Sequence, residues 1–222
     1  MTFDFKKEYR ALYQPGTTPS IVTVPKMNYL AVRGIGDPNQ AGGEYKESIE
    51  LLYGIAYILK MSKKSSHTIA GFFDYVVPPL EGFWWQNNSQ SYMDYTRKQD
   101  MHFISLIRLP DFVTKEDFDW AVAMATAKKK RDFSPVEFFA YDEGLCVQCM
   151  HIGVYDNEPV TVAAMHSTAL MHGYDIDINA QRFHHEIYLS DPRKTTPEKM
   201  RTVLRHPIKK RVEPARRELR EP

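Results

Sequence analysis

Residues 183–190 carry the side chains best placed to do chemistry. The segment has the composition of a β-strand, and successive side chains of a strand point to opposite faces. Mostly apolar residues occupy its odd positions, which predicts that this face packs into a core. Glu186 and Tyr188 then project together from the other face, where an acid and a phenol could act on one ligand. The competing interpretation is that this face is merely solvated.

A group of aromatic residues lies on and after a second predicted strand, residues 72–77. Aromatic side chains with a nearby carboxylate suit a planar, weakly basic or cationic ligand. The same residues could instead form a lid-like part of the core. Because residues 72–77 are predicted to be the counterpart of 183–190, we expect both segments to face one shared groove. The residues concerned are Tyr75, Glu81, Phe83, Trp84 and Trp85.

A third group begins at Tyr155, where a phenol and the carboxylate of Glu158 stand at the start of a predicted helix. Helix capping is a sufficient role for Asp156 or Asn157, since both types are favoured at that position. Tyr155, in contrast, needs packing or a ligand to explain it.

Three carboxylates thus compete for the central role in a ligand site, namely Glu186, Glu81 and Glu158. Two further residues complete the set that we expect to contact a ligand. Tyr53 lies on a predicted helix, and His184 lies on the same predicted strand as Glu186.

The spacing of histidine and cysteine matches no metal or redox site. Eight histidines occur, but none has a metal-ligand spacing such as HExxH, and His184 and His185 should point to opposite faces of their strand. Cys146 and Cys149 should likewise lie on opposite faces of a strand, so we interpret them as core residues. We therefore predict no metal site.

Signatures of phosphoryl and hydride transfer are missing as well. The glycines Gly34 and Gly36 lack the third glycine of a dinucleotide-binding turn, and the sequence has neither a phosphate loop nor a nucleophile elbow. We expect no cofactor.

Composition narrows the class of protein. The 222 residues are 43% hydrophobic and 26% charged, which is ordinary for a compact globular chain. With 29 basic and 28 acidic residues the formal net charge is +1, too weak a field to gather nucleic acid or an anionic membrane. The first residues are charged and no apolar run is long enough to span a membrane, so we expect a cytoplasmic protein. The oligomeric state stays open.

The predicted elements that position these residues follow one order twice. In the first half a strand, a helix and two strands are expected at 21–32, 44–61, 72–77 and 101–109. A linking helix at 114–131 and a strand at 136–141 follow. In the second half the same order is expected at 145–154, 159–173, 183–190 and 202–208. The sequence therefore predicts an α+β fold built from two βαββ modules.

Short segments support this duplication. The turn that starts at Gly34 can be laid over the one that starts at Gly153, and matching Pro79 to Pro192 brings Tyr75 onto Tyr188. The resulting domain organisation has an N-terminal extension, two modules joined by a helix, and a disordered tail. Its boundaries are 1–20, about 21–110, about 114–131, about 136–208, and 209–222.

The segments 151–159 and 185–193, with the continuation 197–205 and the earlier segment 79–85, resemble stand-alone GyrI-like small-molecule-binding proteins. The resemblance covers roughly residues 21–208. It implies two βαββ modules in a pseudo-twofold arrangement, with antiparallel sheets, helices on one side and a ligand groove on the other.

The same resemblance implies a function. Relatives include gyrase inhibitors and the effector domains of multidrug-responsive activators, in which a glutamate in an aromatic groove meets cationic or planar drugs. Glu186 matches that glutamate best. No DNA-binding segment precedes residue 21, so the chain is similar to the effector module alone, and the leading hypothesis is binding of xenobiotics. A protein-interaction role of the gyrase-inhibitor kind is a third hypothesis.

One branch of the family opens the strained cyclopropane of DNA-alkylating natural products of the yatakemycin and duocarmycin type, and the sequence resembles that branch. A hydrolase is therefore the second hypothesis. Aromatic walls would bind the flat substrate, Glu186 would accept a proton from water, and Tyr188 would stabilise the developing oxyanion. Desolvation by Tyr75, Trp84 and Trp85 should raise the pKa of Glu186.

Overall fold

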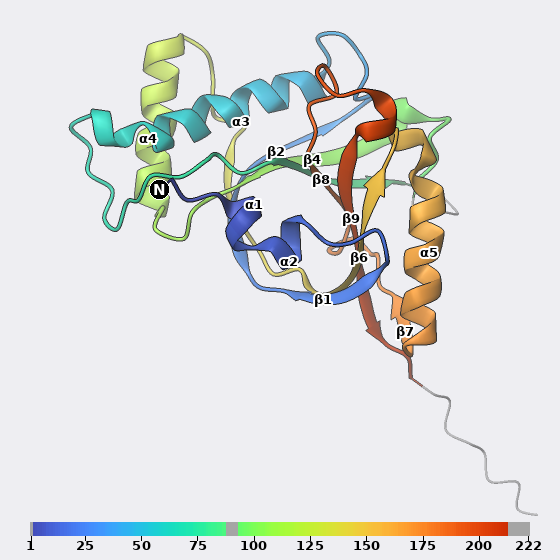
Figure 1. Cartoon of the computed structure of the whole chain (residues 1–222). Helices are drawn as coiled ribbons and strands as arrows, with labels where there is room; N and C mark the ends of the chain where they lie inside the picture. The colour runs from blue at the N-terminus through green and yellow to red at the C-terminus, as the bar shows by residue number, and fades with distance from the viewer. Residues whose placement is uncertain (1, 88–92, 213–222) are drawn as a thin grey trace, which may run out of the picture.

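The structure of the chain is a computed structural model that describes residues 2–87 and 93–212. Its centre is an antiparallel sheet in the order β1-β6-β9-β8-β3-β4-β2-β5, with β7 paired to β9 (Figure 1). The α+β class expected from the sequence is confirmed. The strands are β1 (Ser20–Val24), β2 (Met27–Ile35), β3 (Leu80–Gln86), β4 (Met101–Arg108), β5 (Glu137–Tyr141), β6 (Gly144–Ile152), β7 (Tyr174–Ile176), β8 (His184–Tyr188) and β9 (Arg201–Lys210).

The two halves of the chain meet where β3 pairs with β8 in the middle of the sheet. Gly82 lies opposite Glu186, and Trp84 lies opposite His184. The strands β4 and β2 extend the sheet beyond β3, and β9 and β6 extend it beyond β8. The strand that carries Glu186 is therefore held on both sides by neighbours.

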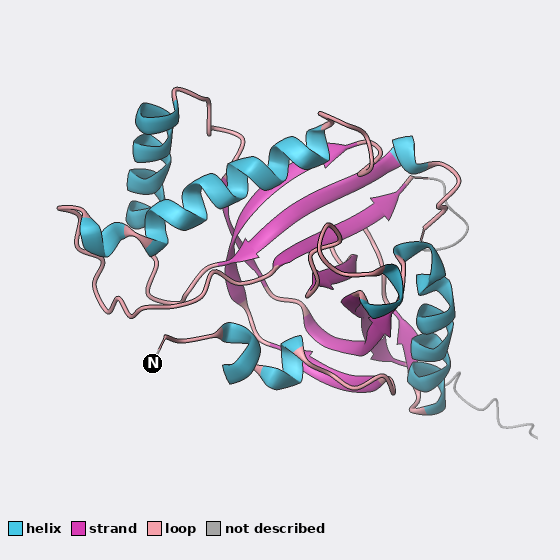
Figure 2. Ribbon diagram, turned by 45° about the horizontal axis from the view of Figure 1, so that its top comes forward, coloured by secondary structure: helices cyan, strands magenta, loops and turns pink. Residues whose placement is uncertain are grey.

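Helices cover the face of the sheet on which Glu186 lies. The helix α3 (Glu44–Lys60) lies along β2 and β4, and α4 (Lys115–Lys129) packs against α3 (Figure 2). Their shared core contains Leu30, Leu52, Ile55 and Ile107. The helix α5 (Glu158–Met171) packs on β6 and β7 and closes a smaller core. Glu186 and Tyr188 thus lie on the helix-bearing face, rather than on the open face that the resemblance implied.

The opposite face of the sheet is filled by a second core. Two short helices, α1 (Phe5–Glu8) and α2 (Arg10–Tyr13), lie there, and the side chains of Phe5 and Tyr13 are buried. This core also receives Phe83 from β3 and Ile187 from β8. The N-terminal extension is therefore packed against the domain.

The predicted strand at 72–77 is wrong. Within it Tyr75 forms only an isolated bridge to Phe3, and the ring of Tyr75 packs against Phe5, Phe72 and Phe112. The strand of this half is instead β3, whose residues were expected to form an aromatic connection. Aromatic and β-branched residues favour both a strand and a packed loop, so composition did not separate the two.

The other predicted strand and helix boundaries differ less from those of the structure. The single strand expected at 21–32 is two strands, because Pro25 lies between β1 and β2 and has no backbone N–H to donate to a sheet. The helix α4 begins as predicted after Thr114, whose side chain accepts a hydrogen bond from the backbone N–H of Asp117. β7 was not expected from the sequence.

The two halves share the order strand, helix, strand, strand, apart from the added β7. At the end of the first strand of each half, Gly36 and Gly153 have φ of +131° and +136°. The backbone N–H of Gly36 donates to the carbonyl of Met101, the first residue of β4. The backbone N–H of Gly153 donates to the carbonyl of Met200, the residue before β9. The structural counterpart of Gly153 is therefore Gly36 and not Gly34, two residues from the alignment made on sequence. The pseudo-twofold relation and the module boundaries stay predictions.

The C-terminal part of the chain continues further in the sheet than expected. β9 extends through Lys210, so residues 209 and 210 are part of a strand. The rest of the predicted tail lies, from residue 213 onward, outside the described residues. In the described ranges no helix is long and apolar enough to cross a membrane.

Candidate functional site

Strand β8 presents Glu186 and Tyr188 on one face, as the alternation predicted. The indole Nε1 of Trp84, on β3, donates a 2.8 Å hydrogen bond to the hydroxyl of Tyr188. Gly82 makes this contact sterically possible, because a Cβ atom there would lie 2.6 Å from Nε1 of Trp84 and 3.0 Å from the hydroxyl of Tyr188. The glycine therefore lets the indole lie against the strand.

Glu158 is the first residue of α5, and its side chain is fully buried beside Glu186. The hydroxyl of Tyr95 donates a 3.1 Å hydrogen bond to Oε2 of Glu158. Its Oε1 atom has no hydrogen-bond partner within residues 2–87 and 93–212. Burial, together with the charge of Glu186, raises the pKa of Glu158 well above its ordinary value. The surroundings of Glu158 therefore favour its protonated form.

His184 joins this pair of acids from the same strand as Glu186. Its Nε2 lies 3.0 Å from Oε1 of Glu186, and its Nδ1 lies 2.6 Å from Nε2 of His206 on β9. One ligand atom from each of Glu158, His184 and Glu186 lies within 4.8 Å of the others, close enough to meet one cation. Nε2 of His184 and Oε1 of Glu186 also share a hydrogen bond, so these groups can exchange a proton. We call these three residues the Glu186 cluster.

Phenols surround the Glu186 cluster. The ring of Tyr155 meets that of Tyr188 edge to face at 5.9 Å, and the ring of Tyr45 lies 5.1 Å from Trp84. Burial and the nearby charge of Glu186 raise the pKa of both Tyr155 and Tyr188. Both phenols therefore keep their protons at neutral pH and can donate hydrogen bonds.

Two helices begin at the cluster. Tyr45 is the second residue of α3, and Glu158 is the first residue of α5. The N-terminal end of a helix carries unpaired N–H groups and a partial positive charge, which favours a carboxylate or a developing anion nearby. This placement suits a site that handles negative charge.

Not all predicted site residues belong to this cluster. The structure brings together Glu186, Tyr188, Trp84, Tyr155, Glu158 and His184. On β3, however, alternation turns Glu81, Phe83 and Trp85 to the opposite face. Phe83 and Trp85 there pack against Phe183. The strand predicted for this half lies at 72–77, so the sequence does not predict the alternation of residues 80–86.

Tyr75 and Tyr53 also lie elsewhere. Tyr75 is buried in the core beneath α1. Tyr53 lines a separate surface cavity of about 490 Å³ between α3 and the end of α4, beside Tyr57 and Phe133. Neither contacts Glu186.

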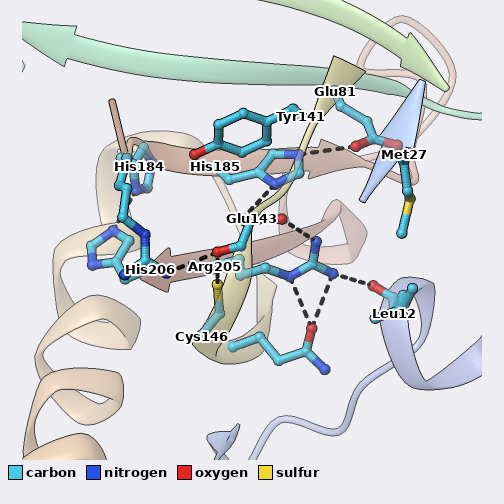
Figure 3. A network of polar contacts seen from close by, with 12 residues as sticks. Leu12, Met27, Glu81, Tyr141, Glu143, Cys146, His184, His185, Arg205 and His206 are labelled. Atoms are coloured by element: carbon cyan, nitrogen blue, oxygen red, sulfur yellow. Dashed lines mark hydrogen bonds and ion pairs between the residues drawn. The ribbon is translucent and has the colours of Figure 1, made fainter. Parts of the chain in front are cut away.

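A second polar network lies on the opposite face of the sheet (Figure 3). His185 contacts Glu143 through Nδ1 and Glu81 through Nε2, both at 3.0 Å. Tyr13 donates to Glu81, and Arg205 lies 3.0 Å from Glu143. Arg205 also donates to Gln148 and to the backbone carbonyl of Leu12. We call this set the His185 network.

Mutual charge stabilises the His185 network. Burial alone would raise the pKa of Glu143, but the charges of His185 and Arg205 lower it to about 2. Burial alone would lower the pKa of His185, but the charge of Glu143 and the hydrogen bonds that both carboxylates accept from His185 raise it. The rival carboxylate Glu81 is thus paired inside a core and turned away from Glu186.

Sequence reasoning missed several neighbours of the Glu186 cluster. These are Tyr45 and Tyr95, whose phenols meet the cluster, and His206, whose ring contacts His184. Tyr45 is part of the helical repeat of α3 and reads as a core residue. His206 occupies a strand position three residues from Val203, with no motif to mark it. The interpretation of the cysteines holds, because Cys146 and Cys149 are buried in cores on opposite faces of the sheet.

The fold and this arrangement define the class: an α+β small-molecule-binding protein with a polar cluster beside helix N-termini. The family model described as the GyrI-like small molecule binding domain matches residues 17–209, so the chain belongs to the GyrI-like family. A small molecule is therefore its ligand class. No curated protein sequence matches the chain.

Solved structures agree with this assignment. A hydrolase from Listeria innocua is 44% identical, with a TM-score of 0.84 and 94% of this chain and 100% of that chain covered. An uncharacterized conserved protein from Listeria innocua is 46% identical, with a TM-score of 0.87 and the same coverage. The C-terminal domain of EcmrR shares the fold at 13% identity, with a TM-score of 0.51 over 86% of this chain and 97% of that one.

Proposed function

We propose that the protein is a hydrolase that adds water to a flat, electrophilic small molecule in which a cyclopropane is conjugated to a dienone. The observation that carries this proposal is the pair of neighbouring carboxyl groups in unlike surroundings. Glu186 meets the ring of His184, whereas Glu158 is fully buried with a raised pKa. Two carboxyl groups held in different protonation states can serve as a base and an acid in one step.

The surroundings of Glu186 decide its role as the base. A neutral imidazole can donate its Nε2 hydrogen to the ionised carboxylate at 3.0 Å, which leaves the second carboxylate oxygen for water. The side chain of Glu186 is only 9% exposed, so few other waters compete for it. Glu186 is therefore placed to orient one water and accept its proton.

Glu158 and the phenols serve the other end of the reaction. As water attacks the ring, an O–C bond forms, the strained C–C bond breaks, and its electron pair moves into the dienone to give a phenolate. Glu158 then gives its proton to that oxygen, while Tyr188 donates a hydrogen bond to it. Afterwards Glu186 has to release the proton that it took from water and Glu158 has to regain one, so the reaction as a whole causes no net change in protons.

The substrate class follows from the aromatic side chains around the cluster. Trp84, Tyr45 and Tyr155 present ring surfaces and phenol edges, which suit a flat aromatic molecule. The 44% identical hydrolase from Listeria innocua supports a hydrolytic rather than a purely binding role. We further propose that the reaction takes place in the cytoplasm and removes DNA-alkylating xenobiotics.

The test is to incubate the protein with a duocarmycin-type cyclopropane compound in H₂¹⁸O and follow the product by mass spectrometry. We expect many turnovers, with one ¹⁸O per product. The variant Glu186→Gln should bind the compound but lose turnover by about 10²–10⁴-fold, the usual contribution of a positioned general base. Glu198→Gln, an exposed glutamate, serves as the matched control and should retain full turnover.

Two results would contradict the proposal. Tight binding without water addition by the unaltered protein would leave a protein that only sequesters the compound. Full activity of Glu186→Gln would remove Glu186 from the mechanism and shift attention to Glu158.

A further inference from the structure

A row of three imidazole rings leads from Glu186 to the outer part of α5. Nε2 of His184 lies 3.0 Å from Glu186, and Nδ1 of His184 lies 2.6 Å from Nε2 of His206. Nδ1 of His206 in turn lies 2.8 Å from Nε2 of His166, which is half-buried on α5. Each of the two inner rings uses both of its nitrogens within the row.

The hydrogen positions along this row are linked. A neutral imidazole carries one hydrogen, so one nitrogen donates and the other accepts. If Glu186 is ionised, Nε2 of His184 donates to it, and Nδ1 of His184 must accept from Nε2 of His206. Nδ1 of His206 must then accept from Nε2 of His166. One charge on Glu186 therefore sets the same tautomer, with hydrogen on Nε2, in all three rings.

We propose that His184, His206 and His166 form a proton relay through which Glu186 exchanges protons with solvent on the outer side of α5. A proton that arrives at Nδ1 of His166 displaces the hydrogen on Nε2 to His206. The hydrogen of His206 moves to His184, and that of His184 moves to Glu186. Release of a proton from Glu186 follows the same steps in the opposite direction. One proton enters at His166 for each proton delivered to Glu186, so no single proton has to travel the whole row.

The relay gives Glu186 a route that a bound ligand does not block. Within residues 2–87 and 93–212, the ionisable groups that face Glu186 besides His184 include Glu158, Tyr155, Tyr188 and Tyr45. Glu158 is fully buried, and a flat ligand against the phenols would exclude the remaining water. The relay instead carries protons through His206 on β9 and His166 on α5. In the proposed reaction it sets how many protons the two carboxyl groups hold before each turnover.

The electrostatics of the outer rings agree with this role. Burial lowers the pKa of both His166 and His206, that of His206 well below its ordinary value, and a positive charge on His184 would lower both further. Both rings are therefore neutral near neutral pH. Neutral rings are what a relay by tautomer exchange requires, because a permanently charged ring has no acceptor nitrogen.

The first test does not depend on turnover. Two-bond ¹H–¹⁵N correlation spectra of protein labelled with ¹⁵N-histidine report the tautomer of each ring, and single-histidine variants assign the signals. At neutral pH we expect hydrogen on Nε2 in His184, His206 and His166. One ring with its hydrogen on Nδ1 beside a neighbour with its hydrogen on Nε2 would break the row and overturn the proposal.

The second test uses turnover of the cyclopropane compound. His166→Gln keeps a polar side chain at a half-buried position but cannot pass a proton, and we expect kcat to fall about tenfold with KM unchanged. The solvent isotope effect in D₂O should change as well. His172→Gln is the matched control, because His172 lies at the end of the same helix and its ring bonds to the local carbonyl of Thr168. Its kcat should stay within twofold of the unaltered protein.

His206→Gln interrupts the middle of the row and should lower kcat further, by about 10²-fold, within the range for proton transfer by a positioned group. Thermal unfolding and ligand-induced quenching of tryptophan fluorescence show whether this buried variant keeps its fold and its ligand site. Unchanged kcat, pH profile and isotope effect in His166→Gln would overturn the relay.

The relay rests on the proposed function only for the role of its inner end. If the unaltered protein turns nothing over, the hydrolase proposal fails, and the histidine spectra still decide whether the row of tautomers exists. If turnover is normal and the spectra show neighbouring rings with hydrogen on different nitrogens, the relay proposal fails and the hydrolase proposal remains.

Discussion

Strand β8 places two neighbouring histidines in opposite settings. His185 lies in a network in which two carboxylates, a guanidinium and a phenol satisfy one another. His184, on the other face, contacts Glu186 beside an acid whose Oε1 lacks a partner in the described part of the chain. Both sets are buried and polar. In the described part of the chain the carboxylates of the His185 network are paired, whereas Oε1 of Glu158 beside Glu186 is not.

The difference separates a structural role from a functional one. Buried polar groups that are fully paired hold elements in one arrangement, and the His185 network ties β3, β6, β8 and β9 to the N-terminal helices. A buried acid with an open oxygen is unfavourable for folding and is expected where a ligand or a proton has to be handled. We therefore expect changes to the His185 network to alter stability, and changes to the Glu186 cluster to alter activity.

The largest effect should come from opening the closed network. Arg205→Met leaves Glu143 buried without its guanidinium partner, and breaking such a pair destabilises a protein by about 3–5 kcal/mol. Urea denaturation measures this change. Arg201→Met, at an exposed position on the same strand, is the control and should change the free energy of unfolding by less than about 0.5 kcal/mol. An Arg205→Met protein as stable as the unaltered one would refute the structural role.

The matching change in the open cluster is Glu158→Gln, which removes the acid but keeps its shape. We expect kcat to fall by about 10²-fold while the free energy of unfolding changes little, because Gln needs no desolvation of a charge. In the unaltered protein activity should fall as pH rises through the raised pKa of Glu158, and this alkaline loss should be absent in the variant. Rate profiles between pH 5 and 10 measure this alkaline loss in both proteins. An alkaline loss that persists in Glu158→Gln would exclude Glu158 as the acid.

The two networks should also differ in how stability depends on pH. His185 has a raised pKa, so its stabilising contribution is complete below its ordinary pKa and is lost as pH rises through the folded value. Glu143 has its pKa lowered to about 2, so its contribution is present above its ordinary pKa and is lost as pH falls. His185→Gln should therefore flatten the alkaline decline, by about 1.4 kcal/mol per pKa unit. An unchanged slope in urea titrations would contradict this.

A smaller effect is expected from Gly82→Ala, which adds a methyl group where the indole of Trp84 lies. The indole must move and lose its hydrogen bond to Tyr188, which is worth about 1 kcal/mol and lowers ligand affinity about fivefold. Fluorescence titration with the cyclopropane compound measures it. Gly16→Ala, which meets only ordinary van der Waals contact, should bind normally. Equal affinities for both variants would show that the indole position does not matter.

The smallest effect should come from removal of metal ions. Glu158, His184 and Glu186 could together meet one cation, but the proposed step uses them as acid and base. Because the carboxyl groups serve as base and acid, the proposed reaction needs no metal ion. We therefore expect dialysis against EDTA to leave turnover unchanged within about twofold. Loss of activity that one divalent metal restores would redefine the cluster as a metal centre and contradict the proposed roles.

Much of this comparison could be predicted from the sequence of β8. Alternation separated His184 from His185 and put Glu186 beside Tyr188, because the period of a strand is two regardless of what surrounds it. The capped start of α4 was also readable, because capping is local, and helical periodicity indicated α3 and α5. Asn157 stands at the N-cap of α5, but its side chain makes no capping hydrogen bond. The same rule would have placed Trp84 correctly if residues 80–86 had been recognised as a strand.

The sequence by itself determined the strand faces, the main helices and the resemblance to the GyrI-like family. Only the tertiary structure decided which carboxylate lies beside Glu186. Pairing of β3 with β8 turned Glu81 into the opposite core, and the start of α5 brought Glu158 to the cluster. The row through His206 and His166 was likewise set by packing of β9 and α5. Contacts between residues far apart in the chain depend on strand order and helix docking, which no local pattern encodes.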